Sequence, residues 1–483
     1  MSVRSAILSS LALVLLTGCM VGPKYVKPAV PMAPGSTPAS PDAYKENGNW
    51  QPATPQDATL RGDWWTIFGD DGLNQLEPKI AVSNQNLKAA EARFREAKTQ
   101  IQYNRSFLAP TIGVAPFAGG ERLSANQPYF NQSYANSGDA LLQLPLQLSY
   151  EVDVWGRIRH SINAAREEAQ ASAGDLQAAQ LSLQSELAVD YFEARTADAQ
   201  EKLLQAAVKD YEEALNITTN RFEGGVSPES DVDQAKTQLQ AAQVQASDVA
   251  IIRAQYEHAV AVLIGQPPAS FSLPVSPLSA QPPPIPTGLP SQLLERRPDI
   301  AAAERRMNEQ NERIGIAKAA YYPTLSLGGL AGFEGNGLST ILAASSYVWA
   351  VGPTLSETVF DYGRRHAVTA QAYAGYDETV ANYRQTSLSA FQQVEDNLVA
   401  LRVLQQEAEQ QHQATQAAIA AEKIFNNRYV GGVDNYLNVV LAQTTTLTNQ
   451  RNDIDIMRRQ MDASVLLIKA LGGGWNVTNL PKL

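Results

Sequence analysis

The sequence predicts an α+β membrane protein with an internal duplication, in which long helices carry a few β-strands. Three observations support this fold class. One motif occurs twice at a distance of 207 residues, two stretches of 66 residues contain no proline, and one segment alternates strictly between apolar and polar residues. A period of two is typical of a strand with one apolar and one polar face, whereas long proline-free stretches favour helices.

The duplication is visible in residue identities. The motif Arg-Phe-Glu-Gly-Gly-Val at 221–226 returns as Arg-Tyr-Val-Gly-Gly-Val at 428–433, and 428 − 221 = 207. A repeat of about 200 residues indicates a duplicated domain rather than a solenoid unit. We predict a first repeat at 73–265 (helix, strand, loop, strand, long helix, helix), a proline-rich linker at 266–292, a second repeat at 293–472 and a C-terminal tail at 473–483.

The start of the chain has the proportions of a signal peptide. An apolar run from Ala6 to Leu16 follows Arg4 and is too short for a permanent membrane helix. The residues Leu-Thr-Gly-Cys at 16–19 resemble the lipobox of bacterial lipoproteins, in which the cysteine becomes the acylated first residue. This resemblance implies a signal peptide at 1–18, a covalent lipid on Cys19 and a lipid-anchored periplasmic segment at 19–72. Met20, which is not Asp, implies sorting to the outer membrane.

Composition excludes several kinds of site. Cys19 is the only cysteine, so neither a disulfide nor a thiolate zinc site is possible. The net charge of −11 makes the chain a poor candidate for nucleic-acid binding. The four histidines are scattered without a carboxylate at ligand spacing, and the glycine pairs do not match a phosphate loop. We therefore expect no enzyme activity, no catalytic residue, no metal site and no cofactor besides the lipid.

The strands point to a membrane barrel. After the signal peptide no run of about 18 apolar residues occurs, so any crossing must use strands. From Leu142 to Val154 thirteen residues alternate without a break, as a wall between lipid and water requires. Weaker strands are predicted at 324–333, from Tyr347 to Leu355, and around Ile112 and Val114, broken by Pro116. Four strands leave open edges in lipid, and the smallest barrels have about eight, so copies must assemble.

Most of the remaining chain is predicted to be helical. Residues 157–222 and 364–429 each contain no proline and one glycine, and such helices extend about 100 Å. Shorter helices are expected at 73–107, 229–264, 298–321 (extended upstream to Leu293) and 435–471. Two of these stacked end to end match one long helix. A narrow apolar stripe formed by Phe391, Val394, Leu398 and Leu401 is typical of a coiled-coil seam.

Several stretches together resemble the outer-membrane efflux lipoproteins of the TolC/OprM class, the outer membrane factors of resistance-nodulation-division (RND) efflux systems, in the NodT-like subgroup. The matching stretches span nearly the whole mature chain. They are Gly-Cys-Met-Val-Gly-Pro-Lys-Tyr at 18–25, Trp-Trp at 64–65 with Phe-Gly-Asp at 68–70, Tyr-Glu-Val-Asp-Val-Trp-Gly-Arg-Ile-Arg at 150–159, Leu-Leu-Glu-Arg-Arg-Pro-Asp-Ile at 293–300 and Ala-Leu-Gly-Gly-Gly-Trp at 470–475.

This resemblance implies a homotrimer. Its 12-stranded outer-membrane β-barrel, with four strands from each chain, continues as a long α-helical coiled-coil tunnel in the periplasm. The implied function is a passive exit channel that exports small molecules from an inner-membrane RND-type pump through a periplasmic adaptor. Outer-membrane lipid is a further partner. Two alternatives remain open, namely a type I protein-secretion duct and a non-channel periplasmic lipoprotein scaffold.

The resemblance also implies a gate at the periplasmic end, where the repeated Gly-Gly turns lie. Arg428 and Tyr429 would link to Asp231 on the neighbouring hairpin, and charge-assisted hydrogen bonds of this kind are the stronger ones. Ordinary surface capping contacts are the alternative. If the links close the gate, Tyr429→Phe with Arg428→Ser should raise the single-channel conductance.

The sequence departs from the family pattern beside this turn. The family usually places acids one or two turns beyond it, where this chain has Asn438 and Leu441. The nearest remaining acid is Asp434, which lies next to the turn. We therefore predict an apolar constriction from Leu437 and Leu441 and a cation selectivity weaker than is usual in the family.

Overall fold

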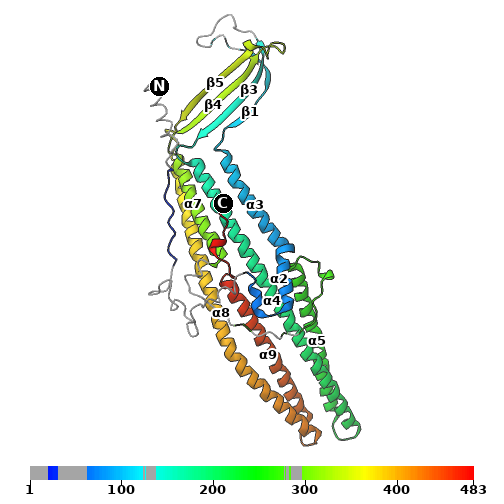
Figure 1. Cartoon of the computed structure of the whole chain (residues 1–483). Helices are drawn as coiled ribbons and strands as arrows, with labels where there is room; N and C mark the ends of the chain where they lie inside the picture. Colours follow the sequence, from blue (N-terminus) through cyan, green and yellow to red (C-terminus); the bar gives the residue numbers. More distant parts are fainter. Residues whose placement is uncertain are drawn as a thin grey trace.

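Two helices of 67 residues, α4 (Arg157–Glu223) and α8 (Arg364–Val430), run the length of the helical part of the molecule (Figure 1). The computed structural model describes residues 20–30, 62–122, 124, 126, 138–276, 278, 282–283 and 296–483. The predicted signal peptide, Cys19 and most of the 19–72 segment lie outside the described residues. Both long helices were predicted within one residue of their observed ends.

The described residues also form five shorter α-helices: α2 (Asp71–Ser83), α3 (Gln85–Ser106), α5 (Glu229–Leu263), α7 (Pro298–Ala319) and α9 (Tyr436–Ala470). The single helix predicted at 73–107 was wrong, because the chain breaks at Asn84. This residue is extended, and its side chain caps α3 by accepting a hydrogen bond from the Leu87 amide at 3.0 Å. The break separates α2 from α3 and turns the chain between them.

The short helices stack end to end, as predicted. The Asn84 side chain donates to the Leu263 carbonyl at 2.8 Å, which joins α3 to α5. In the second repeat the Arg297 guanidinium donates to the Ala470 carbonyl at 3.1 Å and joins α7 to α9. Glycine ends α5 and α9 at 265 and 472, with φ of +72° and +93°. A Cβ there would lie 2.4 and 2.1 Å from the Ser83 and Arg296 carbonyl oxygens, so both joints need glycine.

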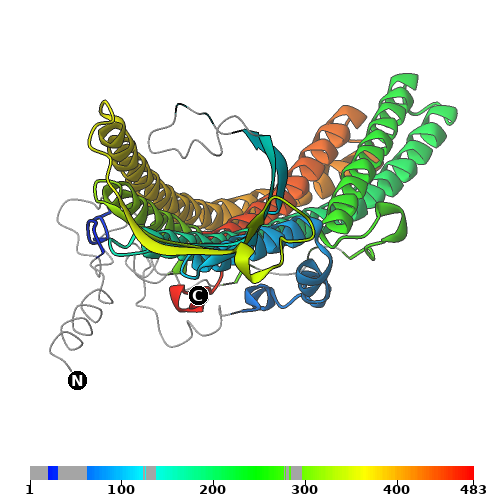
Figure 2. The same ribbon diagram turned by 90° about the horizontal axis from the view of Figure 1, so that it is seen from above.

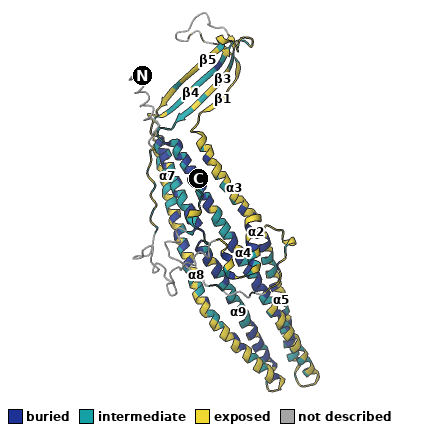
Figure 3. Cartoon of the chain, in the orientation of Figure 1, coloured by how far each residue is buried: buried dark blue, intermediate teal, exposed yellow. Residues whose placement is uncertain are grey.

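The helices form a wall in which the stacked pairs alternate with the long helices. The order across the wall is α3 with α5, then α4, then α7 with α9, then α8. The two long helices differ in burial, since α4 buries 25 of its 67 residues and α8 buries 8 of its 67. Figure 3 shows that α8 and α3, at opposite edges of the wall, are largely exposed. Each edge of the helical wall therefore has one side that no other described helix covers.

The strands form one antiparallel sheet at the end of the wall. They are β1 (Thr111–Val114), β2 (Phe117–Arg122), β3 (Gly138–Val152), β4 (Thr324–Gly335) and β5 (Tyr347–Ser356). The order is β1-β3-β4-β5, and β2 also pairs with β3. Because β1 and β2 lie along successive parts of β3, they form one strand interrupted at Ala115 and Pro116. The four predicted strands are confirmed, with β3 beginning and ending earlier than expected.

The register gives the sheet one apolar face. Directly paired residues share a face, so each row across the strands can be read from the pairing. The rows on this face are Val114, Leu146, Ala331 and Trp349, then Ile112, Leu148, Gly329 and Val351, then Leu144, Phe333 and Tyr347, then Tyr150, Leu327 and Pro353, and finally Val152, Leu325 and Leu355. Several of these side chains are exposed, including Trp349 at 68% and Val351 at 65%. Figure 2 shows that the sheet is strongly curved.

The largest core cluster joins the N-terminal elements to the middle of α4. The short helix η3 (Trp64–Phe68) places Phe68 5.1 Å from Phe192, measured between ring centroids. Asp70 accepts hydrogen bonds from the Leu73 amide at 3.0 Å and from the Tyr191 hydroxyl at 2.6 Å. One carboxylate thus caps α2 and fixes it to α4.

The beginning of the predicted linker lies against the helices. The Ser276 amide donates to Asp198 at 2.9 Å, and the Arg253 guanidinium donates to the Leu273 carbonyl and to Asp198. Leu273 is buried at 4% exposure. This part of the predicted linker at 266–292 is therefore packed on α4 and α5.

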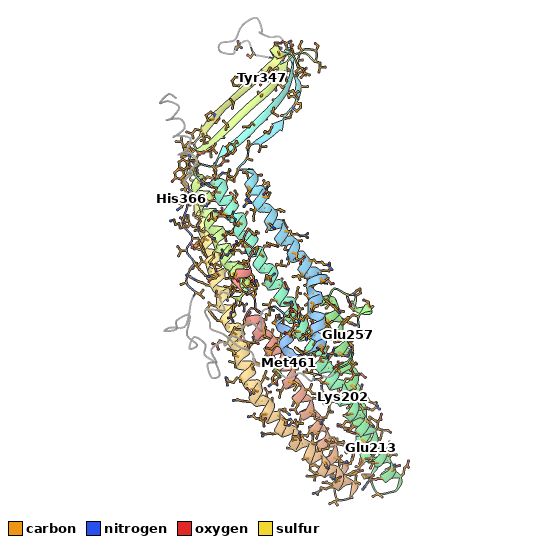
Figure 4. All side chains as sticks on the ribbon, in the orientation of Figure 1. Lys202, Glu213, Glu257, Tyr347, His366 and Met461 are labelled. Atoms are coloured by element: carbon orange, nitrogen blue, oxygen red, sulfur yellow. The ribbon has the colours of Figure 1, made fainter. Side chains whose placement is uncertain are left out.

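The segment that follows Cys19 begins beneath the sheet and runs along α7. The Val21 amide donates to the Trp155 carbonyl at 3.2 Å, and Asn311 donates to the Pro23 carbonyl at 3.1 Å. Further along, Lys27 forms an ion pair with Glu304 at 2.6 Å. Met20 therefore lies beside Gly156, at the junction of sheet and helices. In Figure 4, His366 marks the level of this junction and Tyr347 marks the far end of the sheet.

Candidate functional site at the helical tip

The two hairpin turns at the end of the helical wall have the same construction. The Val226 amide donates to the Arg221 carbonyl at 2.8 Å, and the Gly225 amide donates to the Phe222 carbonyl at 2.9 Å. The Val433 and Gly432 amides repeat this pattern at 2.9 and 3.0 Å. These are Schellman C-caps, and the second glycine of each motif is left-handed, with φ of +70° and +73°. The repeated motif is therefore a helix-ending signal.

A small aromatic core joins the two hairpins above the turns. Tyr429, Tyr436, Ala235 and Val439 are all buried and in contact. The Tyr429 and Tyr436 rings lie 5.2 Å apart at 56°. Burial raises the pKa of Tyr436 to about 12. Since Ala235 belongs to α5 and the others to the second hairpin, this core connects the two repeats.

Arg221 bridges the hairpins from the first repeat. Its guanidinium carbon lies 4.7 Å from the centre of the Tyr429 ring, a cation–π geometry. Its Nη1 also donates to the Val430 carbonyl at 3.2 Å. The end of α4 is thereby attached to the last turn of α8.

Asp231 and Tyr429 face each other across the hairpins. Burial raises the pKa of the Tyr429 hydroxyl, and the Asp231 carboxylate raises it further. Burial likewise raises the pKa of Asp231, while Tyr429 and Arg221 lower it. Among the described residues, however, the buried hydroxyl makes no hydrogen bond of good geometry. Tyr429 and Asp231 therefore lie close together, as predicted, but the predicted hydrogen bond between them is not formed.

Arg428 bonds within its own hairpin. It forms an ion pair with Asp434 at 3.1 Å, so the expected link from Arg428 to Asp231 is not formed within the chain. The Asn438 amide nitrogen donates to the same carboxylate at 2.6 Å, and the Asn435 amide donates at 3.0 Å. Asn438, then Asn435 and Arg428 hold the pKa of Asp434 below its usual value. Asp434 is thus an ionised, fully engaged carboxylate.

Leu437 and Leu441 form an exposed apolar pair on the first two turns of α9. They are 48% and 57% exposed and, four residues apart, share one helix face. Asn438 lies beside them, bonded to Asp434. The structure thus places every predicted residue of the gate at the tip, with the leucines exposed and with Arg428 and Asn438 bonded to Asp434.

The chain matches the family described as Outer membrane efflux protein over residues 78–266 and 289–473. It belongs to this family. The two matched segments cover most of the sequence and correspond to its two halves. The predicted location, the bacterial outer membrane with extension into the periplasm, is therefore confirmed.

Relatives of this outer membrane efflux protein match along almost their full length. It is 31% identical over 475 residues to the Toluene efflux pump outer membrane protein TtgF of Pseudomonas putida, with 97% of each chain covered. The Outer membrane protein OprJ of Pseudomonas aeruginosa is 30% identical, with 97% of this chain and 96% of the relative covered. These relatives are components of transport systems and not enzymes, which agrees with the expected absence of catalysis.

Solved structures of outer-membrane channels share the fold. The channel OprN superposes with a TM-score of 0.83 at 28% identity and covers 95% of this chain and 100% of its own. The Campylobacter jejuni CmeC channel has a TM-score of 0.83 at 26% identity, covering 95% and 96%. The open state of the Neisseria gonorrhoeae MtrE channel has a TM-score of 0.82 at 26% identity, covering 95% and 99%. The predicted fold class is confirmed.

Two contacts were missed from the sequence. Arg221 was noticed only as part of the motif, although its equivalence to Arg428 at the repeat distance was a signal for a role at the tip. The second is the contact of His160 Nδ1 with Glu312 at 2.6 Å, for which the sequence spacing gave no signal. It joins α4 to α7, and within the described ranges no group of side chains is arranged to hold a metal ion. None of the described helices has the apolar stretch of a membrane span.

Proposed function

We propose that three copies of this efflux protein assemble into one passive exit channel across the outer membrane. The observation that carries the proposal is the sheet, which is apolar on one face and has two edges, at β1–β2 and at β5, that pair with no other described strand. Unpaired backbone groups are not tolerated in lipid, so the edges of neighbouring copies must pair. Three copies contribute about twelve strands, which is within the range of closed barrels.

The helical wall supports the same assembly. Within the chain α4 is covered on both sides, by α3 and α5 and by α7 and α9, whereas α8 is covered on one side. The repeat makes α8 the counterpart of α4. The missing neighbour of α8 is therefore α3 with α5 of the next copy, which closes the wall into a tunnel.

The partners follow from the relatives. Several are named as outer membrane proteins of efflux pumps for toluene, solvents or antibiotics. We propose that this chain likewise receives small molecules from an inner-membrane RND-type pump through a periplasmic adaptor, which meets the helical tip. The tip lies at the end of the molecule opposite the sheet (Figure 1), where a periplasmic partner reaches it.

Reconstitution tests the channel directly. The purified, acylated protein should run as a trimer that resists heating in detergent, because strand pairing closes the barrel, and it should conduct ions in planar bilayers. A solitary, water-soluble rod that passes no ions would contradict the proposal and would favour the scaffold alternative.

Ion selectivity tests the composition of the constriction. We expect weak cation selectivity in the parent protein, because Leu437 and Leu441 are apolar and the nearest acid, Asp434, is already paired with Arg428 and Asn438. Leu441→Asp should place an unpaired carboxylate on this face and raise the cation preference, measured by reversal potentials under a salt gradient. Leu441→Asn is the uncharged control. Strong cation preference in the parent that substitution of Asn438 or Leu441 abolishes would disprove the expectation.

The lipid anchor on Cys19 is also proposed. Its support is that Met20, the next residue, lies beneath the sheet beside Trp155 and Gly156, at the level where the barrel would leave the membrane. Labelled palmitate should enter the parent protein and not Cys19→Ser. Equal labelling of both proteins would remove the anchor from this proposal.

We propose that the tip is a gate held closed by the contacts of Arg221, Tyr429, Asp231 and the Arg428–Asp434 pair. These contacts are few, and the Arg428 side chain is 53% exposed. Exposed ion pairs stabilise a structure only weakly, because water and salt screen them. A partner that binds the tip is therefore able to open it at small energetic cost.

A further inference from the structure

Three cations on one side of α9 bond across the chain to the first repeat. The Arg451 guanidinium donates to Gln245 on α5 at 2.8 Å. The Arg458 guanidinium pairs with Glu193 on α4 at 2.7 Å. The Lys469 ammonium donates to Ser182 on α4 at 3.0 Å. We call these three polar contacts the internal seam. Between them Met461, Val465 and Ile468 of α9 belong to the buried apolar cluster on α4.

The repeat replaces all three cations by apolar residues on α5. At the distance of 207, Arg451, Arg458 and Lys469 correspond to Val244, Ile251 and Val262. These three side chains are 60%, 58% and 61% exposed. Their spacings of 7 and 11 residues are close to two and three helical turns, so they form one stripe along α5. We call it the α5 stripe.

One partner of the internal seam becomes apolar at its counterpart on α8. Glu193 corresponds to Ala400, whereas Ser182 corresponds to Ser389, and Gln245 corresponds to Asn452 on α9. Val399 and Leu388 lie next to Ala400 and Ser389 and are 36% and 43% exposed. They belong to α8, whereas the counterpart helix α4 is covered by other helices on both sides. The spacing of 11 residues again places both on one face. We call Leu388, Ser389, Val399 and Ala400 the α8 stripe.

We infer that the α5 stripe of one copy packs against the α8 stripe of the next, as an apolar seam that replaces the ionic one. The inference rests on the proposed assembly, in which α5 and α8 of neighbouring copies meet. In the chain they lie at opposite edges of the wall, as Figures 1 and 4 show, with Glu257 marking α5 and Met461 marking α9 between the edges. The occupant of the α5 stripe is therefore a second copy of this chain.

The two kinds of seam should respond differently to salt. Screening weakens ion pairs, whereas salt does not weaken apolar contacts in this way. High salt should therefore weaken the Arg458–Glu193 ion pair and leave the apolar contacts between copies in place.

Cross-linking tests the contact between copies. Ile251→Cys with Ala400→Cys in the full-length protein, treated with a short bifunctional maleimide, should give covalent dimers and trimers on denaturing gels. The matched control is Arg458→Cys with Glu193→Cys, the equivalent pair inside one chain. This pair should cross-link within the chain, so the protein should still run at the mass of a monomer. The parent protein, with Cys19 alone, sets the background.

Charge substitution tests the apolar character. Ile251→Glu should reduce the association constant of the copies about tenfold or more, because an isoleucine loses its burial and a charge is left unpaired. Ile252→Glu is the control, since its counterpart Arg459 pairs with Glu407 within its own repeat and not across the internal seam. Ile251→Arg with Ala400→Glu should restore assembly at low salt and lose it at high salt, as an ionic seam would.

The outcomes separate the two proposals. If the parent protein forms no conducting trimer, the proposed function fails and the inference fails with it. If the parent is a conducting trimer but Ile251 and Ala400 give no cross-link between copies and Ile251→Glu assembles normally, the apolar seam alone is overturned.

Discussion

Arg221→Ser combined with Arg428→Ser is expected to raise the single-channel conductance of the purified protein. Arg221 is the only one of the two that reaches between hairpins, through the Tyr429 ring at 4.7 Å and the Val430 carbonyl at 3.2 Å. Arg428 holds the turn of the second hairpin through Asp434. The cation–π contact that spans the hairpins contributes about 1 kcal/mol, so its loss should raise the ratio of open to closed tips about fivefold.

The combination Tyr429→Phe with Arg428→Ser should raise conductance less. Phenylalanine keeps the ring under Arg221, and the lost hydroxyl makes no hydrogen bond of good geometry within the described residues. A control that removes the same charge is Lys236→Ser with Lys423→Ser, two exposed residues on α5 and α8. Conductance equal to that of the parent in the arginine variant, or an equal rise in the lysine control, would disprove the role of these contacts.

Glu77→Leu is expected to stabilise the protein strongly at alkaline pH. Glu77 lies in α2 between Leu73, Leu76 and Ile80, which are buried on the same face. Its exposure is 0%, and neither carboxylate oxygen has a hydrogen-bond partner among the described residues. Burial without a partner raises the pKa of this carboxyl to about 9 from an ordinary value of 4.5. At neutral pH Glu77 is therefore protonated in the folded protein.

The sign of the pH dependence follows from linkage. Between pH 4.5 and 9 the folded protein keeps a proton that the unfolded chain releases, so stability is fully present below pH 4.5 and falls as the pH rises towards 9. The loss is about 1.4 kcal/mol for each pH unit, or about 3 kcal/mol at pH 7. Glu77→Leu removes this loss and adds apolar contact, so the difference in Tm from the parent should grow steadily from pH 5 to pH 9.

Two further variants separate charge from packing. Glu77→Gln should remove the pH dependence while leaving a buried polar group, so its stability should be flat with pH and lower than that of Glu77→Leu. Glu91→Leu, at an exposed position of α3, should follow the parent. The Tm of each variant is measured by thermal unfolding in detergent between pH 5 and 9. If the Tm of the parent and the Tm of Glu77→Leu changed with pH in the same way, Glu77 would not be neutral in the folded protein.

Much of the architecture was predictable because local chemistry decides it. The long helices end at Gly-Gly turns that form Schellman caps, and these signals are contained in six adjacent residues. The β3 strand was found from its alternation, since every second residue must face lipid or water. The break at Asn84 was missed because one extended asparagine within a helical pattern has no strong sequence signal, and its buried hydrogen bond to Leu263 involves a residue 179 positions away.

The gate was only partly predictable, because its contacts cross between repeats. The resemblance led to Tyr429 and Asp231, which do face each other, and to Arg428, which instead bonds with Asp434. Which of two equivalent arginines spans the hairpins depends on how α4 and α8 are placed. The same is true of His160 and Glu312, which are 152 residues apart and meet only because α7 lies against α4.

The sequence by itself determined the duplication, the lengths of the two long helices and the four strands, because each depends on periodicity or on residues adjacent in the chain. The tertiary structure alone decided which side of each helix meets another element. Equivalent positions of the two repeats therefore hold Arg458 paired with Glu193 in one case and an exposed Ile251 in the other. The equivalent helices α5 and α9 acquire different surfaces because α9 is covered by α4 of its own chain, whereas the corresponding side of α5 is exposed.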